Sequence, residues 1–429
     1  MIDVNLIREK PNLIKENIKK KFQQDKVHLV DKFISLDEEW RKLKSKLDEL
    51  RHERNLISEK INLAKKEKSQ DDFKKLIKKA QDLPKEIQTS ESRLEKLEQE
   101  TKQILLQMPN IMSKHVPIGK DASQNKEVKK SGKIPKFNFE VKNHVELLEN
   151  LGLADFEKSA KTSGNGFYYL KNELAHLNQA LIRFAIDFLK KKNYIYVETP
   201  LMLRSNIAFA AFDKKTIEES VYKIENEDLN LIGTSEQSLL GMHNNEIIPE
   251  EKLPLKYFSY SMCFRKEVGA HGINEKGLWR THQFNKVEQV IFSKPEDSEK
   301  YFDELLKNSE EILKALELPY RIIDICSGDL SDWKNYQKDI EVYRPTTKDY
   351  GEVVSLSNCT DYQARKLNIR CESKDGEKRV LHTLNDTAIA TSRILVAIIE
   401  NFQQKDGSIK IPKVLHKYTG FKVIKNAKR

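Results

Sequence analysis

The sequence predicts an α+β protein, in which a long antiparallel pair of coiled-coil helices precedes a largely antiparallel sheet flanked by helices. Three observations support this prediction. The first glycine is Gly119, and the stretch before it carries a heptad pattern of apolar residues. From about residue 137 onward, helical periods mix with strand-like apolar runs. The chain has 429 residues, which is too long for one ordinary hydrophobic core.

Two apolar seams with steps of four and three residues predict the helical pair. The stretch 65–72 between them is short and polar, so the two helices are expected to fold back and bury each other's stripe. Pro84 is expected to bend the second helix without ending it. The seams consist of Leu29, Phe33, Leu36, Trp40, Leu43, Leu47, Leu50, Ile57, Ile61 and Ala64, and then of Phe73, Leu76, Ala80, Leu83, Ile87, Leu94, Leu97, Ile104 and Met108.

The composition of the chain changes after residue 110. We expect a helical arm over residues 1–110, a linker rich in turn-forming and polar residues over 111–136, and a second domain over 137–429. Within this domain, residues 178–192 predict an amphipathic helix. Residues 194–197, 284–292 and 379–384 predict strands.

Charge and cysteine content narrow the class of protein. The formal net charge is +10, which indicates a polyanionic partner such as nucleic acid or, equally, a lysine-rich proteome. The lysines on the arm suit a solvated surface or the tracking of a phosphate backbone. The four cysteines form no CxxC pair, which favours reduced thiols in a cytoplasmic protein. No apolar run is long enough to predict a membrane span.

The stretch with the most chemical information is FRKE at 264–267, a glycine-bearing loop, and RTHQFNKVE at 280–288. It predicts two antiparallel strands joined by a loop. Arg265 can bind a phosphate through its planar guanidinium, and Glu267 can accept from an adenine amino group or a ligand ammonium. Phe284 offers a ring on which a base can stack, and Glu288 shares its face of the strand. The chain contains no GxxxxGK[ST] motif, so any use of ATP requires another scaffold.

This stretch resembles motif 2 of class II aminoacyl-tRNA synthetases in its seryl form. Three further blocks are similar to that family and follow in its order: TSE at 234–236, EVVS at 352–355 with SNC at 357–359 and DYQAR at 361–365, and NDTAIATSR at 385–393 followed by an apolar helix. The resemblance covers nearly the whole chain, including the arm. It implies an antiparallel class II sheet and a homodimer built around motif 1 near Pro200.

The resemblance implies a role for each matching residue. Arg265 would contact the α-phosphate and Arg393 the γ-phosphate of ATP, and these two would be the catalytic residues. Glu352 and Ser355 would hold Mg²⁺ through ATP. L-Serine would be bound by Thr234, Glu236, Arg265, Glu288 and Thr387. ATP would be bound by Arg265, Lys266, Glu267, Thr281, His282, Gln283, Phe284, Glu352, Val353, Val354, Ser355 and Arg393.

The implied activity is ATP-dependent activation of L-serine to seryl-adenylate, followed by transfer to tRNA(Ser). Whether tRNA(Sec) is charged as well stays open. The arm would contact the long variable arm of the tRNA. No zinc is expected, because no cysteine falls beside Glu236 or Glu288. Many members of the family have glycines within the last of these blocks, where this chain has Asp386, Ala388 and Ser392. Many also have an arginine in a G-x-R-F pattern, where this chain has Gly164-Asn165-Gly166-Phe167.

Three other functions stay open. A related protein could load a small amino acid onto a carrier protein, but such a protein has little need of a basic arm. A non-catalytic RNA-binding scaffold could keep the fold, but it would not need Arg265, Glu288 or Arg393. A class II enzyme for another amino acid is disfavoured by Thr234, Glu236 and the SNC block.

Overall fold

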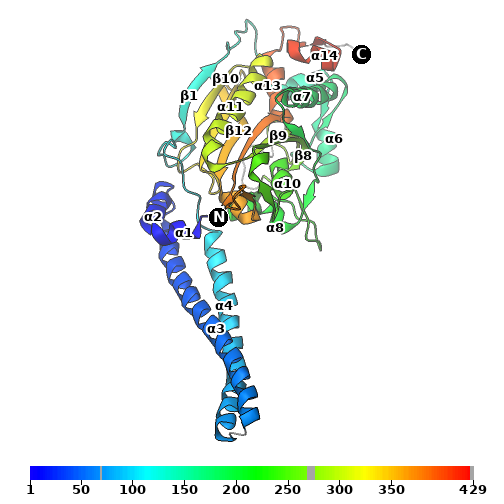
Figure 1. The fold of residues 1–429 in the computed structure, drawn as a ribbon. Coiled ribbons are helices and arrows are strands. Elements are labelled where there is room, and N and C mark those ends of the chain that lie inside the picture. Colours follow the sequence, from blue (N-terminus) through cyan, green and yellow to red (C-terminus); the bar gives the residue numbers. More distant parts are fainter. Residues whose placement is uncertain (68–69, 268–275, 426–429) are drawn as a thin grey trace. The chain divides into compact units, whose positions relative to one another are not determined.

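The computed structural model describes residues 1–67, 70–267 and 276–425 (Figure 1). The chain forms two compact units. One comprises residues 2–19 and 23–108, and the other comprises residue 1, residues 20–22 and residues 109–429.

The first unit is helical. Two long helices pair along their apolar seams, and five of the heptad residues form a closed cluster: Leu47, Leu50, Ile57, Leu83 and Ile87. The predicted coiled-coil pair is therefore confirmed. Pro84 lies inside the second long helix, which continues on both sides of it. The unit contains α1 (Val4–Glu9), α2 (Pro11–Lys20), the 3-10 helix η1 (Gln24–Lys26), α3 (His28–Glu67) and α4 (Gln70–Leu105). Residues 68–69 of the predicted turn lie outside the described residues.

A buried carboxylate joins α1 to α3. Asp37 is 5% exposed and accepts from Arg8 Nε at 2.9 Å, from Arg8 Nη2 at 2.6 Å and from Arg41 Nε at 3.0 Å. Burial alone would raise the pKa of Asp37, but the hydrogen bonds and charges of Arg8 and then Arg41 hold that pKa below its ordinary value. The ionised form of Asp37 therefore stabilises this end of the arm.

The second unit is built on an eight-stranded sheet in the order β1-β10-β11-β12-β15-β9-β8-β4. Neighbouring strands are antiparallel except for β8 and β4, so the predicted α+β fold with a largely antiparallel sheet is confirmed. The strands are β1 (Lys126–Ser131), β4 (Ile195–Tyr196), β8 (Leu255–Phe264), β9 (Gln283–Ser293), β10 (Tyr320–Asp324), β11 (Tyr336–Arg344), β12 (Asp349–Thr360) and β15 (His382–Ala390).

The hydrophobic core lies between this sheet and three amphipathic helices, α7 (Asn172–Lys191), α11 (Ser298–Ala315) and α13 (Thr391–Asn401). Successive side chains of β9 point to opposite faces of the sheet, one towards the core and the other towards a cavity. Val287 and Ile291 belong to the core, whereas Phe284, Lys286 and Glu288 line a cavity. The cavity therefore lies on the face of the sheet opposite the core helices.

Shorter elements complete the unit. The helices are α5 (His144–Asn150), α6 (Phe156–Ser163), α8 (Ser205–Ala208), α9 (Lys214–Ser220), α10 (Ser235–Gly241), α12 (Tyr362–Leu367) and α14 (His416–Thr419), with the 3-10 helices η2 (Ala122–Gln124), η3 (Glu250–Lys252), η4 (Pro295–Asp297) and η5 (Lys413–Leu415). The small sheets pair β14 (Lys378–Val380) with β13 (Arg370–Glu372) and β7 (Ile247–Pro249), β16 (Ile409–Lys410) with β17 (Val423–Ile424), β2 (Ala154–Asp155) with β3 (Tyr169–Leu170), and β5 (Met202–Leu203) with β6 (Asn230–Leu231).

The large sheet contains several β-bulges, and two of them, in β12 and β15, lie next to cavity-lining residues. Ile340 pairs with Val354 and Glu341 with Glu352, so Val353 is an extra residue in β12. In the same way, Ala388 is an extra residue in β15, between Thr387 and Ile389. A bulge shifts the alternation of side chains by one residue, so residues three apart can point to the same face.

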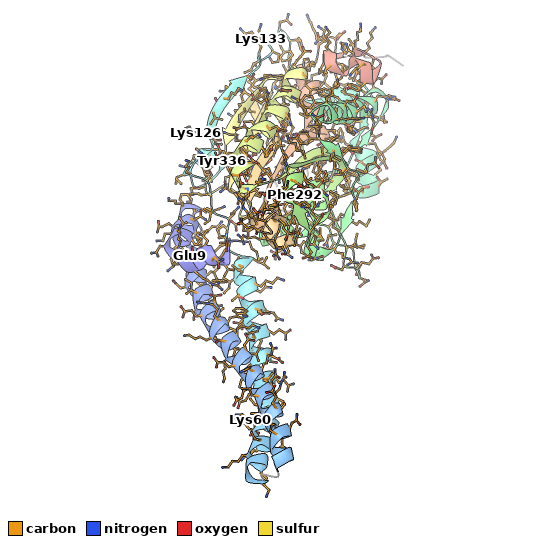
Figure 2. All side chains as sticks on the ribbon, viewed as in Figure 1. Glu9, Lys60, Lys126, Lys133, Phe292 and Tyr336 are labelled. Carbon is orange, nitrogen blue, oxygen red and sulfur yellow. The ribbon has the colours of Figure 1, made fainter. Side chains whose placement is uncertain are left out.

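Strand β1 lies within the stretch that the sequence analysis assigned to a linker. It pairs with β10 at the sheet edge, and its side chains are almost all exposed. Figure 2 shows Lys126 at this outer edge and Phe292 of β9 inside the same unit. The strand has no apolar alternation because an edge strand can take its backbone hydrogen bonds without burying side chains. Among the helices of the described residues, none is both long and apolar enough to cross a bilayer.

Candidate active site

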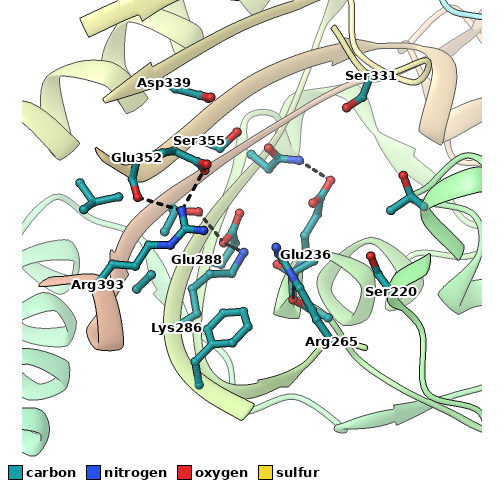
Figure 3. Close-up of a pocket in the computed structure, with 18 of the residues that line it drawn as sticks. Ser220, Glu236, Arg265, Lys286, Glu288, Ser331, Asp339, Glu352, Ser355 and Arg393 are labelled. Atoms are coloured by element: carbon teal, nitrogen blue, oxygen red, sulfur yellow. Dashed lines mark hydrogen bonds and ion pairs between the residues drawn. The ribbon is translucent and has the colours of Figure 1, made fainter. Parts of the chain in front are cut away.

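A cavity of about 450 Å³ opens on the polar face of the sheet. Its walls come from β9, β11, β12 and β15, from α9, and from the first residues of α10 and α13. Figure 3 shows Glu236, Arg265, Lys286, Glu288 and Arg393 converging on it. Segments more than 150 residues apart in the sequence therefore meet at one place.

The deep end of the cavity is a small subsite of buried polar groups. Thr234 caps α10, and its hydroxyl accepts from the backbone N–H of Glu236 at 3.2 Å. Glu236 is 6% exposed and accepts hydrogen bonds from Gln363, at 2.8 Å, and from Asn385. Burial, and then the neighbouring carboxylate of Glu288, raise the pKa of Glu236. A ligand cation would relieve this repulsion.

Glu288 forms the other wall of the subsite. Its carboxylate pairs with Lys286 Nζ at 2.5 Å and accepts from the Thr387 hydroxyl at 3.4 Å. Glu288 and Thr387 are direct neighbours across β9 and β15. The subsite thus combines two carboxylates, one ammonium and two hydroxyl-bearing side chains in a small space, which suits a small ligand with an ammonium and a hydroxyl group.

Arg265 and Phe284 lie next to this subsite. Arg265 directly follows β8, and its Nε donates to the carbonyl of Gly233 at 3.2 Å. Its guanidinium carbon is 5.3 Å from the centre of the Phe284 ring. Glu267 pairs with Arg280 at 2.7 Å. The site therefore offers a cation and an aromatic face beside the buried subsite, as a nucleotide requires.

The other end of the cavity combines Arg393 with acidic and hydroxyl groups. Arg393 Nη1 donates to the carbonyl of Glu352 at 2.8 Å and lies 3.2 Å from its carboxylate. Desolvation opposes ionisation of Glu352, but the charge and hydrogen bond of Arg393 outweigh it and lower the pKa. The bulge at Val353 brings Glu352 and Ser355 to the same cavity although they lie three residues apart on one strand.

Asp339 of β11 completes this acidic end. It pairs across the ladder with Ser355, and Gln337 Nε2 donates to Asp339 at 2.7 Å and to Ser355 Oγ at 3.1 Å. Burial, and then the negative charge of Glu352, raise the pKa of Asp339 to about 7. The groups at this end that could coordinate a cation are the carboxylate and hydroxyl oxygens of Asp339, Glu352 and Ser355, a set that fits Mg²⁺. Within the described ranges, no group of three or more His, Cys, Asp or Glu is placed to hold a metal, so phosphate and water would supply its remaining ligands.

Four predicted ATP-binding residues do not line the cavity: Lys266, His282, Gln283 and Val354. The ring of His282 instead contacts the Tyr222 hydroxyl at 3.0 Å and the carbonyl of Arg265 at 2.9 Å. Val354 is 1% exposed and belongs to the core. Their roles stay predictions. Residues 268–275, which make up most of the predicted loop, lie outside the described residues.

All the other predicted residues line the cavity, and several unpredicted ones join them. Lys286 could have been found, because it precedes Glu288 by two residues and so shares its strand face. Asp339 and Trp279 gave no comparable signal, because their neighbours in the site are distant in the sequence: Asp339 pairs with Ser355, and Trp279 contacts Arg393.

Comparisons with known proteins agree with this geometry. The model of the seryl-tRNA synthetase N-terminal domain matches residues 1–112, and that of the tRNA synthetase class II core domain (G, H, P, S and T) matches residues 218–402. The serine–tRNA ligase of Pyrococcus horikoshii is 44% identical, over 99% of this chain and 97% of that protein.

Two solved structures share the fold over their full length. The crystal structure of seryl-tRNA synthetase from Pyrococcus horikoshii complexed with ATP has a TM-score of 0.94 and 43% identity, and covers 99% of both chains. The cytoplasmic serine–tRNA ligase of Naegleria fowleri in complex with AMP has a TM-score of 0.88 and 33% identity, with the same coverage. The resemblance seen in the sequence is thereby confirmed, and the chain belongs to the seryl-tRNA synthetase family.

Proposed function

We propose that this chain activates L-serine with ATP and transfers the resulting seryl group to tRNA(Ser). The observation that carries the proposal is the buried subsite of Glu236, Glu288 and Thr387 beside Arg265 in one cavity. The two carboxylates face the ammonium of serine, and Thr387 with Glu288 pairs the serine hydroxyl. Arg265 then lies at the carboxylate end of the amino acid, where the α-phosphate must approach.

The first step needs charge stabilisation and no general base. The carboxylate of serine is already ionised at neutral pH, so it attacks the α-phosphorus directly and pyrophosphate leaves. Arg265 stabilises the α-phosphate, and Arg393 binds the γ-phosphate at the other end of the cavity. Phe284 offers its ring to adenine. Glu352 and Ser355 would hold Mg²⁺ together with ATP, and the ion would supply positive charge to the phosphate oxygens.

In the second step, a hydroxyl of the terminal tRNA ribose attacks the carbonyl carbon of the adenylate, and AMP leaves. Selection against alanine follows from the polar subsite, since alanine would leave Thr387 and Glu288 without a hydroxyl partner. The additional methyl group of threonine has little room beside the paired side chains of Lys286 and Glu288, which are 5% and 2% exposed.

The tRNA is proposed to bind along the helical arm. Lys60 of α3 and Lys74, Lys75 and Lys78 of α4 are exposed, and Lys60 projects outward in Figure 2. Such a surface binds phosphates without reading sequence, and its affinity falls with salt.

We also propose a homodimer in the cytoplasm. Strand β4 forms an edge of the large sheet and leaves Ile195 and Tyr196 55% and 36% exposed, while Met262 on the adjacent strand β8 is 39% exposed. An apolar sheet edge of this kind favours pairing with a second copy, which sedimentation of the full chain would test. All four cysteines are buried and free, which suits a compartment that keeps thiols reduced.

ATP–pyrophosphate exchange with each of the twenty amino acids, without tRNA, tests the first step. We expect exchange with serine alone. Charging of tRNA(Ser) and tRNA(Sec) transcripts then tests the acceptor. Exchange with a different amino acid would mean that this amino acid, and not serine, is the substrate. No exchange at all would favour a non-catalytic scaffold, and exchange without charging of either tRNA would favour a carrier protein as acceptor.

A further inference from the structure

A tryptophan with no assigned role contacts Arg393. The guanidinium carbon of Arg393 lies 5.6 Å from the centre of the Trp279 ring, and Arg393 Nε lies 3.4 Å from the Trp279 carbonyl oxygen. A second arginine, Arg344, lies over the same ring at 4.3 Å. Trp279 therefore contacts two cations at once, and one of them is the group proposed to meet the γ-phosphate.

The indole ring fits closely against the strand that carries Glu352. A Cβ atom added to Gly351 would lie 2.3 Å from Cζ2 of Trp279, so a larger side chain there would displace the ring. Gly351 directly precedes Glu352, which is hydrogen-bonded to Arg393. The ring, Arg393 and the backbone at Glu352 thus form one packed set.

A buried polar network fixes the backbone just before the tryptophan. The backbone N–H of Leu278 donates to His144 Nε2 at 3.1 Å, so Nε2 carries no proton and Nδ1 does. His144 Nδ1 then donates to Glu400 at 3.1 Å. A Cβ on Gly277 would lie 2.5 Å from His144 Nε2, so this glycine permits the close approach.

Glu400 connects this network to the second arginine. Its carboxylate is fully buried and also accepts from Arg344 Nη2 at 3.2 Å and from Thr346 Oγ1 at 2.7 Å. Burial would raise the pKa of Glu400, but the hydrogen bond of His144 and the charge of Arg344 lower it, so the carboxylate is ionised and compensates Arg344. Arg344 is therefore held in place against the Trp279 ring.

We propose that Trp279 is a positioning residue for Arg393. The ring, held by Arg344, Gly351 and the His144–Glu400 pair, restricts the guanidinium of Arg393 to the orientation that faces the distal phosphate of ATP. A long arginine side chain loses conformational freedom when it binds a phosphate, and a fixed aromatic wall removes much of that freedom beforehand. The inference depends on the proposed role of Arg393 in ATP binding.

Steady-state pyrophosphate exchange tests this inference. Trp279→Leu should raise the KM for ATP by about 3- to 30-fold, the effect expected from losing a cation–π contact, and should change the KM for serine by less than about twofold. Trp279→Tyr keeps an aromatic face, so its KM for ATP should stay within about threefold of that of the natural protein. Trp40→Leu, in the arm, is the matched control and should leave both constants unchanged. If Trp279→Leu does not fold, as judged by its melting curve, Trp279→Met replaces it.

A double-mutant comparison separates this inference from the proposed function. The double variant Trp279→Leu with Arg393→Ala should have the same KM for ATP as Arg393→Ala alone, because the ring acts through that arginine. If Arg393→Ala leaves the KM for ATP unchanged, the assignment of Arg393 is wrong and the inference falls with it. If Arg393→Ala raises this KM but Trp279→Leu does not, or if Trp279→Leu raises the constants for ATP and serine equally, the positioning role alone is overturned.

Discussion

The arm and the catalytic unit use their sequences in different ways. In the arm, the cluster around Leu47 and Leu83 comes from a stripe that repeats every seven residues, and each apolar layer resembles the next. In the catalytic unit, Glu236 comes from α10, whereas Glu288 and Glu352 come from two strands. They meet at one cavity only through the tertiary fold, including the register of the sheet. A periodic region therefore tolerates local change, whereas the site depends on single positions.

The largest effect is expected at such a single position. Arg265→Ala should lower serine-dependent pyrophosphate exchange by about 10²- to 10³-fold, because a preorganised cation at the α-phosphate is lost. Arg379→Ala is the control and should leave pyrophosphate exchange intact. Arg379 lies in β14 of the small three-stranded sheet and pairs with Glu296. Comparable activity in the two variants would contradict the assignment of Arg265.

The arm should respond to a cavity in its apolar stripe without any effect on chemistry. Leu47 is 1% exposed, and Leu47→Ala should destabilise the α3–α4 pair by about 2–4 kcal/mol. Amide hydrogen exchange along both helices measures this, and pyrophosphate exchange should not change. Leu63→Ala is the matched control, since Leu63 lies in the same helix but is 56% exposed. A loss of adenylation in Leu47→Ala would show that the two units are energetically coupled.

The buried carboxylate of the arm should make its stability depend on pH. The pKa of Asp37 is lowered by folding, so its contribution is fully present above the ordinary value of 3.8 and is lost as pH falls through the lowered pKa. Asp37→Asn should cost about 1.5–3 kcal/mol at pH 7, the value of hydrogen bonds to a charged group. The difference in stability between Asp37→Asn and the natural chain should shrink below about pH 3.8.

Amide hydrogen exchange in α1 and α3 provides the measurement. Asp48→Asn is the control, because Asp48 is 57% exposed and lies 3.6 Å from Lys44. A pH-independent difference between Asp37→Asn and the natural chain would mean that the ionised form of Asp37 is not what stabilises this part of the arm.

The smallest effect is expected from the surface charges of the arm. Replacing Lys74, Lys75 and Lys78 by alanine should raise the KM for tRNA by about tenfold at low salt and less at high salt, with pyrophosphate exchange unchanged. The control replaces three lysines of the catalytic unit by alanine: Lys374, Lys378 and Lys405. If the two sets of substitutions raised the KM for tRNA equally, the overall charge of the protein, and not the arm, would govern tRNA binding.

The sequence predicted the arm in detail because each of its contacts follows from local spacing. Heptad steps alone placed Leu47, Ile57 and Ile87 in the interface, and α3 and α4 contain the two predicted seams except for Met108, which lies beyond the end of α4. Strand β1 was missed for the opposite reason. It is an edge strand of mostly charged residues, and only its pairing with β10 defines it.

The candidate site was predicted in part, through the resemblance of its motifs to a known family. Period-two alternation would have placed Glu352 and Ser355 on opposite faces of β12, and a bulge at Val353 brings them together. Asp339 joins them only because β11 pairs with β12 in one particular register. Neither the bulge nor the register leaves a pattern within a single stretch of sequence.

The pairing of charges inside the cavity has a consequence for turnover. Lys286 already pairs with Glu288, and Arg393 with Glu352. A charged substrate group that binds Glu288 or Arg393 therefore replaces a protein partner, so the net gain in free energy at these two contacts is smaller than the contact itself. The guanidinium carbon of Arg265 likewise lies 5.3 Å from the centre of the Phe284 ring, the ring proposed to receive adenine. When pyrophosphate and AMP depart, the original pairs re-form, which lowers the cost of releasing highly charged products.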